Sequence, residues 1–243
     1  MNKLAIIIVL TSVLTLFSCT KKDDPEPIGT EGAIIGRVQL FDEAKNAKNN
    51  DGMIVSIYGS NPLISDTTDA NGSYHFAHVK YGTYSLVFVK PNYGIFMINN
   101  VYHTLETTEV SITPNLGEIS TTHIDNINSK DTLGSVFIYI STSPIGTANT
   151  PKYLRVFFHT SDMVGYDNFT SYTTVLQSTN NPLEYRLNPH KLEDMGFQSG
   201  ETVWFKAYGE SYYSNAHIEP LKGKHIFPNI NLISAAANSF IVP

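Results

Sequence analysis

The chain has 243 residues, of which 16 are Lys or Arg and 22 are Asp or Glu, so its net charge at pH 7 is −6. The basic residues form no cluster of the kind that binds nucleic acid, which excludes nucleic acid as an expected partner. Charged residues make up only 16% of the chain and aromatic residues reach 12%, a balance that favours β-strands, whose half-buried surfaces suit aromatic side chains.

Residues 1–18 have the pattern of a signal peptide. Lys3 gives a positive head, and a mostly apolar stretch then runs from Leu4 to Phe17, which is shorter than the roughly 20 residues that a membrane-spanning helix needs. The stretch ends in Leu16-Phe17-Ser18-Cys19, which resembles the lipobox of bacterial lipoproteins. This resemblance implies cleavage before Cys19 and acylation of Cys19, the only cysteine of the chain. The alternative is an ordinary secretory signal.

Residues 19–31 read as a charged tether that contains two prolines and cannot bury apolar area. Within it, Lys21, Lys22, Asp23 and Asp24 directly follow Cys19. They resemble the acidic export signal of surface lipoproteins in one large group of Gram-negative bacteria. We therefore expect a protein attached to the outer membrane through a lipid at Cys19 and facing the cell exterior. An orientation toward the periplasm is the alternative.

Residues 32–113 alternate between apolar and polar side chains, as β-strands do. The strands expected here are "AIIGRVQL" from Ala33, "MIVSIYG" from Met53, "SYHFAHV" from Ser73 and "YGTYSLVFV" from Tyr81. Asn71-Gly72 before the third of them predicts a tight hairpin turn with positive φ angles. The motif T-D-A-N-G-S-Y-H-F and its surroundings resemble the carboxypeptidase regulatory-like family. That resemblance implies a small transthyretin-like β-sandwich that serves as a stabilising or interaction domain without an active site.

Residues 114–243 contain a second series of strand patterns separated by turn signals, which is typical of a β-sandwich. The apolar faces expected to point inward are those of Val136, Ile138 and Ile140, of Leu154, Val156 and Phe158, and of Val203, Phe205 and Ala207. The segment that leads into the last of these strands resembles fibronectin type III and immunoglobulin-like domains. The chain lacks the cysteine pair of true immunoglobulin domains, and its Trp204 lies in a late strand. The sequence thus predicts an all-β protein with two β-sandwich domains in tandem.

Two motifs invite a metal and are rejected. His190 and Glu193 match H-x-x-E, the first half of the zinc motif of metallocarboxypeptidases, but no third ligand or catalytic domain follows. A calcium loop that starts at Thr67 would place His78 where a glutamate is required. No nucleophilic triad and no phosphate-binding loop is present, so we expect neither an enzyme nor a cofactor.

Aromatic residues in two expected loops suggest a place for a ligand, because exposed rings stack on sugars or fill protein pockets. They are Tyr166, Phe169, Tyr172, Tyr212 and Tyr213; the alternative is that they fold back onto the sandwich. The function expected is a binding or accessory module for a glycan or a protein, and the alternative is a structural component of the envelope or a fibre. The oligomeric state is left open.

Two threonines are candidate sites of O-linked glycosylation. Thr67 in Asp66-Thr67-Thr68 and Thr132 in Asp131-Thr132-Leu133 resemble the short acceptor sequence of exported proteins in the same bacterial group. Both lie in turn-rich polar stretches, where a glycan would meet water.

Overall fold

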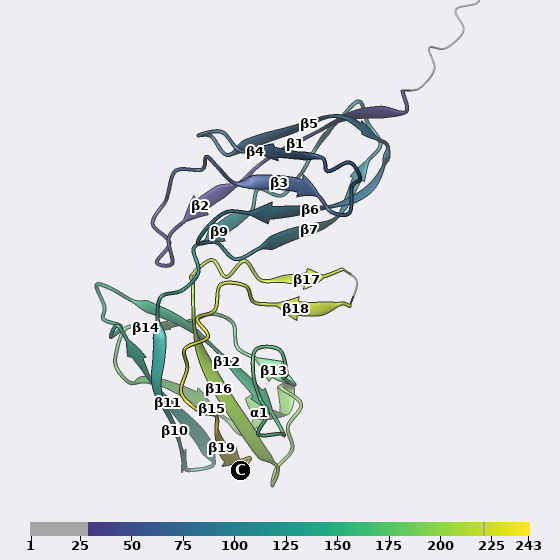
Figure 1. Cartoon of the computed structure of the whole chain (residues 1–243). Helices are drawn as coiled ribbons and strands as arrows, with labels where there is room; N and C mark the ends of the chain where they lie inside the picture. The colour runs from purple at the N-terminus through teal and green to yellow at the C-terminus, as the bar shows by residue number, and fades with distance from the viewer. Residues whose placement is uncertain (1–28, 221) are drawn as a thin grey trace, which may run out of the picture.

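The computed structural model describes residues 29–220 and 222–243, and Figure 1 shows them as two β-sandwiches in tandem. This confirms the predicted all-β fold class. The one helix of the described part is the short α1 (Pro189–Asp194). Among those residues, no helix has the length and apolar character needed to cross a membrane. Residues 1–28, with Cys19 and the charged run of Lys21 to Asp24, lie outside the described part.

The first sandwich, here called the N-terminal module (residues 29–118), consists of two sheets that face each other. One sheet has the strand order β5 (Ser73–Lys80), β1 (Glu31–Arg37) and β8 (Thr107–Glu109). The other has the order β4 (Ser65–Thr67), β3 (Ile54–Ile57), β6 (Gly82–Val89) and β7 (Phe96–His103). A short parallel pair, β2 (Gln39–Phe41) with β9 (Asn115–Gly117), lies at the end nearer the second sandwich.

The core of the N-terminal module lies between its sheets and follows the alternation of the sequence. Residues that the pattern assigns to one face of a strand are buried together, and they come from both sheets: Ile34, Val55, Ile57, Tyr74, Phe76, Leu86 and Phe88. Burying such side chains stabilises the fold by about 1.5–3 kcal/mol each. The apolar pattern therefore determines which face of each strand points inward.

The turn at Asn71-Gly72 differs from the hairpin expected there. Gly72 has φ +79°, but Asn71 is not among the residues with positive φ. The flanking strands do not pair with each other, because β4 pairs with β3 and β5 pairs with β1. The turn, closed by a hydrogen bond from Gly72 N to Asp69 O (2.8 Å), therefore carries the chain from one sheet to the other.

The second sandwich, the C-terminal module (residues 119–243), also has two main sheets. The first has the order β10 (His123–Thr132), β11 (Ser135–Ser143) and β15 (Leu183–Leu187). The second has the order β13 (Ser171–Tyr172), β12 (Lys152–His159), β16 (Thr202–Glu210) and β19 (Asn238–Ile241), with β14 (Leu176–Ser178) also paired to β12. The predicted inward faces are confirmed, since all nine of their residues are buried in one cluster. The domain limits given by the sequence, 32–113 and 114–243, stay a prediction.

One hairpin stands apart from both sandwiches of the described structure. Its strands β17 (His217–Glu219) and β18 (Lys224–Ile226) pair only with each other. It extends from the C-terminal module and runs beneath β7 of the N-terminal module (Figure 1). The sequence pattern predicted no strand in this region.

Candidate binding surface at the module junction

Two buried asparagines join the modules. The Asn229 side chain accepts a hydrogen bond from Gly94 N (2.9 Å) and donates to Gly117 O (2.9 Å) and Tyr213 O (2.8 Å). Asn215 accepts from Gly117 N (2.9 Å) and donates to Gly94 O (3.1 Å). The bonds to Gly94 and Gly117 cross between the modules and are buried, so the network fixes the position of one module against the other.

Gly94 permits this close approach. A Cβ atom at this position would lie 2.5 Å from Asn229 Oδ1 and 2.6 Å from the backbone of Pro228. Any other residue would push the loop between β6 and β7 away from the C-terminal module. The modules therefore contact each other through backbone as well as side chains.

The hairpin β17–β18 contacts both modules. On the N-terminal side the His217 ring meets the Phe96 ring edge-on at 5.8 Å, and Asn99 Nδ2 donates to Ile218 O (2.8 Å). On the C-terminal side the Tyr172 hydroxyl and His225 Nδ1 lie 3.2 Å apart. The hairpin thus braces the junction on one side of the molecule.

Phe227, which follows the hairpin, anchors it in an aromatic cluster of the C-terminal module. Its ring packs against Phe157 (5.1 Å between centroids) and Tyr172 (4.9 Å). The guanidinium of Arg155 lies over the same ring at 4.6 Å. A cation held over an aromatic face is stabilised by the negative charge of that face.

Arg155 also forms a buried ion pair with Glu210 beneath this cluster. Arg155 Nε donates to Glu210 Oε2 (3.2 Å) and Arg155 Nη1 donates to Thr173 O (2.6 Å). Burial raises the pKa of Glu210 from 4.5 to about 7, because the loss of hydration outweighs the attraction of Arg155. Both side chains of the pair are buried, with 5% of Arg155 and none of Glu210 exposed.

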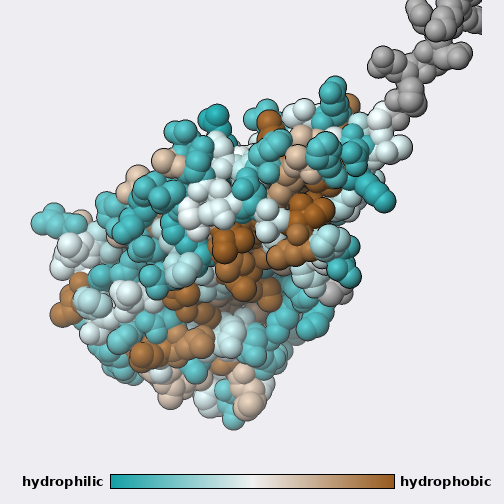
Figure 2. Space-filling model, turned by 45° about the horizontal axis from the view of Figure 1, so that its top comes forward, coloured by the Kyte–Doolittle hydropathy of each residue, from teal (hydrophilic) through white to brown (hydrophobic). Residues whose placement is uncertain are grey.

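An apolar groove runs over the junction on the hairpin side. One hollow of about 500 Å³ lies between the modules, and a second of about 240 Å³ lies against the loop before β13. Ile226 and Pro228 line both hollows, so the two are halves of one surface. We call it the junction groove and define it by Tyr93, Gly94, Ile95, Ile119, Tyr166, Asp167, His217, Glu219, Lys224, His225, Ile226, Phe227, Pro228, Ile230 and Leu232. Figure 2 shows hydrophobic residues gathered in the middle of this face, where the surface is hollowed.

Several aliphatic side chains of the junction groove are open to solvent. The exposed fractions are 51% for Ile95, 40% for Ile119 and 63% for Leu232. Contiguous exposed apolar surface of this kind marks interaction sites in soluble proteins. The groove therefore has the character of a binding surface.

The five aromatic residues singled out in the sequence fall into three places. Tyr166 lines the junction groove. Phe169 and Tyr172 fold back onto the aromatic cluster, as the alternative expected. Tyr212 and Tyr213 lie together at another part of the junction, where Tyr213 packs on Phe41 (4.4 Å between centroids). The structure thus brings only Tyr166 into the groove.

These rings do not form a flat platform. Tyr166 meets Tyr208 at an interplanar angle of 90°, and Tyr212 meets Tyr213 at 86°. Coplanar exposed rings would favour stacking on a sugar, whereas edge-on pairs present only one ring face each. In both pairs the rings therefore stand edge-on to each other.

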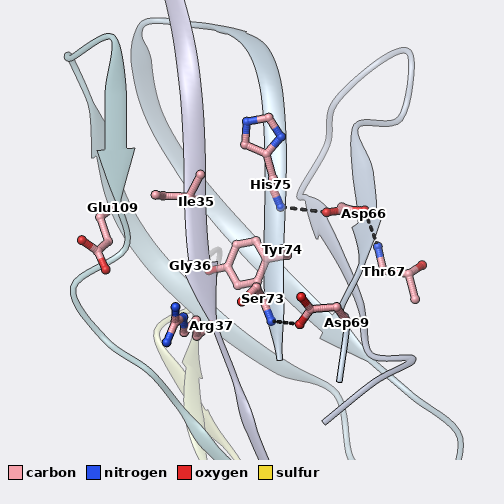
Figure 3. Close-up of a pocket in the computed structure, with 10 residues that line it drawn as sticks. All are labelled: Ile35, Gly36, Arg37, Asp66, Thr67, Asp69, Ser73, Tyr74, His75 and Glu109. Atoms are coloured by element: carbon pink, nitrogen blue, oxygen red, sulfur yellow. Dashed lines mark hydrogen bonds between the residues drawn. The ribbon is translucent and has the colours of Figure 1, made fainter. Parts of the chain in front are cut away.

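A separate polar hollow of about 460 Å³ lies on the N-terminal module beside β5 (Figure 3). Two of its three carboxylates accept backbone hydrogen bonds: Asp66 from His75 N (2.7 Å), and Asp69 from Asn71 N (2.8 Å) and Ser73 N (2.9 Å). Within residues 29–220 and 222–243, no group of three or more His, Cys, Asp or Glu side chains could hold a metal. The loop from Thr67 that resembles a calcium site is a turn, and its Asp69 side chain accepts a hydrogen bond from the backbone of β5.

The remaining candidates are exposed. Thr67 lies on β4, and Thr132 precedes the tip of the β10–β11 hairpin, where Leu133 is fully exposed with φ +51°. Glycosylation of the two threonines stays a prediction. His190 and Glu193 lie on the surface of α1, with His190 Nδ1 and Glu193 Oε2 3.9 Å apart.

Sequence reasoning missed most of the groove. The segment "HIFPNINLISAAANSF" follows no regular alternation and was assigned to no strand, although Ile226, Pro228 and Leu232 belong to it. Ile95 directly precedes the apolar start of β7, and Ile119 stands between polar residues, so neither is distinguished by a local pattern. The available signal was the presence of isolated aliphatic residues in polar, irregular segments.

No family model matches the chain, and no curated protein matches it. Among solved structures, a candidate carbohydrate-binding protein from Bacteroides uniformis ATCC 8492 has 12% identity and a TM-score of 0.31, covering 88% of this chain and 100% of that one. A DUF3823 family protein from the same organism has 13% identity and a TM-score of 0.30, with the same coverage. The FN1–FN3 domains of chicken CNTN1 have 8% identity and a TM-score of 0.31, covering 87% of this chain and 64% of that one.

Proposed function

We propose that this chain is a non-catalytic binding lipoprotein of a bacterial outer membrane, attached through Cys19, and that a protein ligand binds in the junction groove. The observation that carries the proposal is the exposure of Ile95 and Ile119 in one hollow and of Leu232 in the other, where the two hollows share the ridge of Ile226 and Pro228. The joint at Asn215 and Asn229 holds the two halves of the groove in a fixed relation. A groove that is formed before binding loses less entropy when a ligand enters.

A purely structural role is the second function considered. Assembly through strand addition needs an open strand edge. The outer edge of β5 is instead occupied by Asp66 and Asp69, which accept its backbone N–H groups. Strand addition at this edge is therefore opposed, which removes one route to assembly.

The fluorescence of Trp204 offers a test of ligand class, because this residue is the only tryptophan and packs on the cluster that contains Phe227 and Ile230. The mature chain would be titrated with short capped peptides that carry isoleucine at alternate positions, and separately with neutral oligosaccharides. Peptides should shift the emission, and Leu232→Glu should abolish the shift. Ile145→Glu changes an equally exposed isoleucine outside the groove and should leave the shift unchanged. A response to oligosaccharides alone contradicts the proposal.

The lipid anchor is tested by labelling cells with palmitate. The wild type should incorporate label, and Cys19→Ala should not, because the acyl groups would be attached to Cys19. Equal labelling of both chains contradicts lipidation at this residue.

Orientation toward the cell exterior is tested by protease treatment of intact cells. Asp23→Ala combined with Asp24→Ala should keep the lipid but protect the protein from protease, since the acidic run directly after Cys19 resembles an export signal. A wild type as resistant as the double variant contradicts surface exposure.

A further inference from the structure

The junction groove carries charge only at its rim. Asp167 lies at the Tyr166 end of the groove and Glu219 at the hairpin end, while the floor between them is formed by Ile226, Phe227 and Pro228. Neither carboxylate forms an ion pair within residues 29–220 and 222–243. Asp167 is exposed and Glu219 is half-buried, so both are within reach of a bound chain.

One cation lies at the same rim. Lys224 is the register partner of Glu219 on the neighbouring strand, and its side chain is exposed. Lys224 offsets at most one of the two carboxylates, so the lining has a net negative charge when His217 and His225 are counted as neutral. The whole chain has the same sign, with a net charge of −6. A basic ligand is therefore attracted both by the rim and by the overall field.

The shape of the groove suits a polypeptide. Two hollows of about 500 Å³ and 240 Å³ lie on either side of the ridge formed by Ile226 and Pro228. Each is lined mainly by apolar side chains and is open to solvent on one side. An extended segment with an apolar side chain for each hollow would cross the ridge and place its flanking residues beside Asp167 and Glu219.

From these observations we infer that the occupant of the junction groove is a protein segment with aliphatic anchors flanked by Lys or Arg. The inference rests on the proposed function and adds the chemistry of the partner. The aliphatic side chains displace water from Ile95, Ile119 and Leu232, which supplies most of the affinity. The basic residues pair with the carboxylates at the rim, which supplies the selectivity.

Three capped peptides with the same alternating isoleucines test the inference. The residues between the isoleucines are Lys in the first peptide, Thr in the second and Glu in the third. Trp204 emission should show affinity in the order Lys, Thr, Glu, with a factor of about fivefold for each exposed charge pair. The variant Asp167→Lys with Glu219→Lys should reverse this order. Raising the salt concentration should reduce the preference of the wild type.

The control variant Asp125→Lys with Glu184→Lys makes the same change in net charge at exposed positions that do not line the groove. It should keep the order of the wild type. If the control also reverses the order, net charge alone sets the preference and the inference is wrong. If all three peptides bind equally and Leu232→Glu abolishes binding, the inference fails while the proposed function stands.

Two further outcomes concern the occupant. If no peptide binds and only oligosaccharides shift the emission, the proposed function itself fails. If no peptide binds and light scattering shows a dimer that Leu232→Glu dissociates, the occupant is a second copy of this chain. Either result overturns the inference.

Discussion

Burial of the single residue Glu210 makes the stability of the fold depend on pH. Its side chain is fully buried beside Arg155, and its pKa of about 7 lies above its ordinary value of 4.5. Between these two pH values the folded state binds more protons than the unfolded state. The free energy of unfolding therefore falls as the pH rises from 4.5 to 7, by roughly 3 kcal/mol in total, and is constant above that range with respect to this group.

Glu210→Gln should remove this pH dependence, because glutamine keeps an acceptor for Arg155 but does not titrate. Urea unfolding across the same pH range measures the slope. At pH 7 and above the variant leaves Arg155 without a counter-ion, so the slope is compared and not the absolute stability. The exposed Glu184→Gln serves as the control and should retain the slope of the wild type. A slope that persists in Glu210→Gln would assign the titration to another group.

At the scale of elements, β5 illustrates how a sheet edge is closed without a strand. Asp66 and Asp69 accept hydrogen bonds from His75 N and Ser73 N, the donors on the side of β5 away from β1. Asp66→Ala should lower the free energy of unfolding by about 1–3 kcal/mol, because a carboxylate acceptor is lost. It should also promote association, since the open edge can pair with another chain. Urea unfolding and light scattering at high protein concentration measure these two effects.

Asp66→Asn is the matched variant, since its amide oxygen can still accept from His75 N. It should stay monomeric to the same concentration as the wild type and lose less stability than Asp66→Ala. Equal loss in both variants would show that the charge of Asp66, and not its role as an acceptor, stabilises this edge.

Strands with a clear alternation could be predicted from the sequence, and those without it could not. Ile34, Phe76, Val136 and Phe205 lie in the core because their neighbours on either side are polar or face the other way. The hairpin β17–β18 was missed because each strand has only three residues, and its stability depends on contacts with both modules. The hairpin predicted at Asn71-Gly72 was wrong, because a turn sequence does not specify whether the two strands it joins pair with each other.

At the scale of the whole molecule, the relation between the modules depends on residues that no local pattern identifies. Asn215, Asn229 and Gly94 are ordinary turn residues in the sequence, and turns are where their types are common. The structure instead buries both asparagines, which are 5% and 0% exposed, between the modules. Asn215 is 98 residues from Gly117, whose N–H it accepts, and Asn229 is 135 residues from Gly94, whose N–H it accepts. Only a fold that brings these segments together reveals their function.

The buried hydrogen bonds between the modules lead to a prediction about the shape of the molecule. Asn229→Leu keeps a similar volume but leaves Gly94 N and Tyr213 O without their side-chain partner, while Gly117 O keeps only its bond from Asn215 Nδ2. Each unpaired buried group costs about 1–3 kcal/mol, so the junction should open to let water reach them. Small-angle X-ray scattering should then show a larger radius of gyration, and protease should cleave the connection near Ile119 faster than in the wild type.

Asn126→Leu changes an exposed asparagine of β10 and should alter neither measurement. Gly94→Ala tests the same joint from the other module, because its Cβ would press on Asn229 Oδ1 and on Pro228. If the joint forms the groove, both junction variants should also weaken peptide binding, as the two hollows would no longer keep a fixed separation. A variant that opens the junction yet binds peptide as well as the wild type would show that one hollow suffices, and the ligand would then contact a single module.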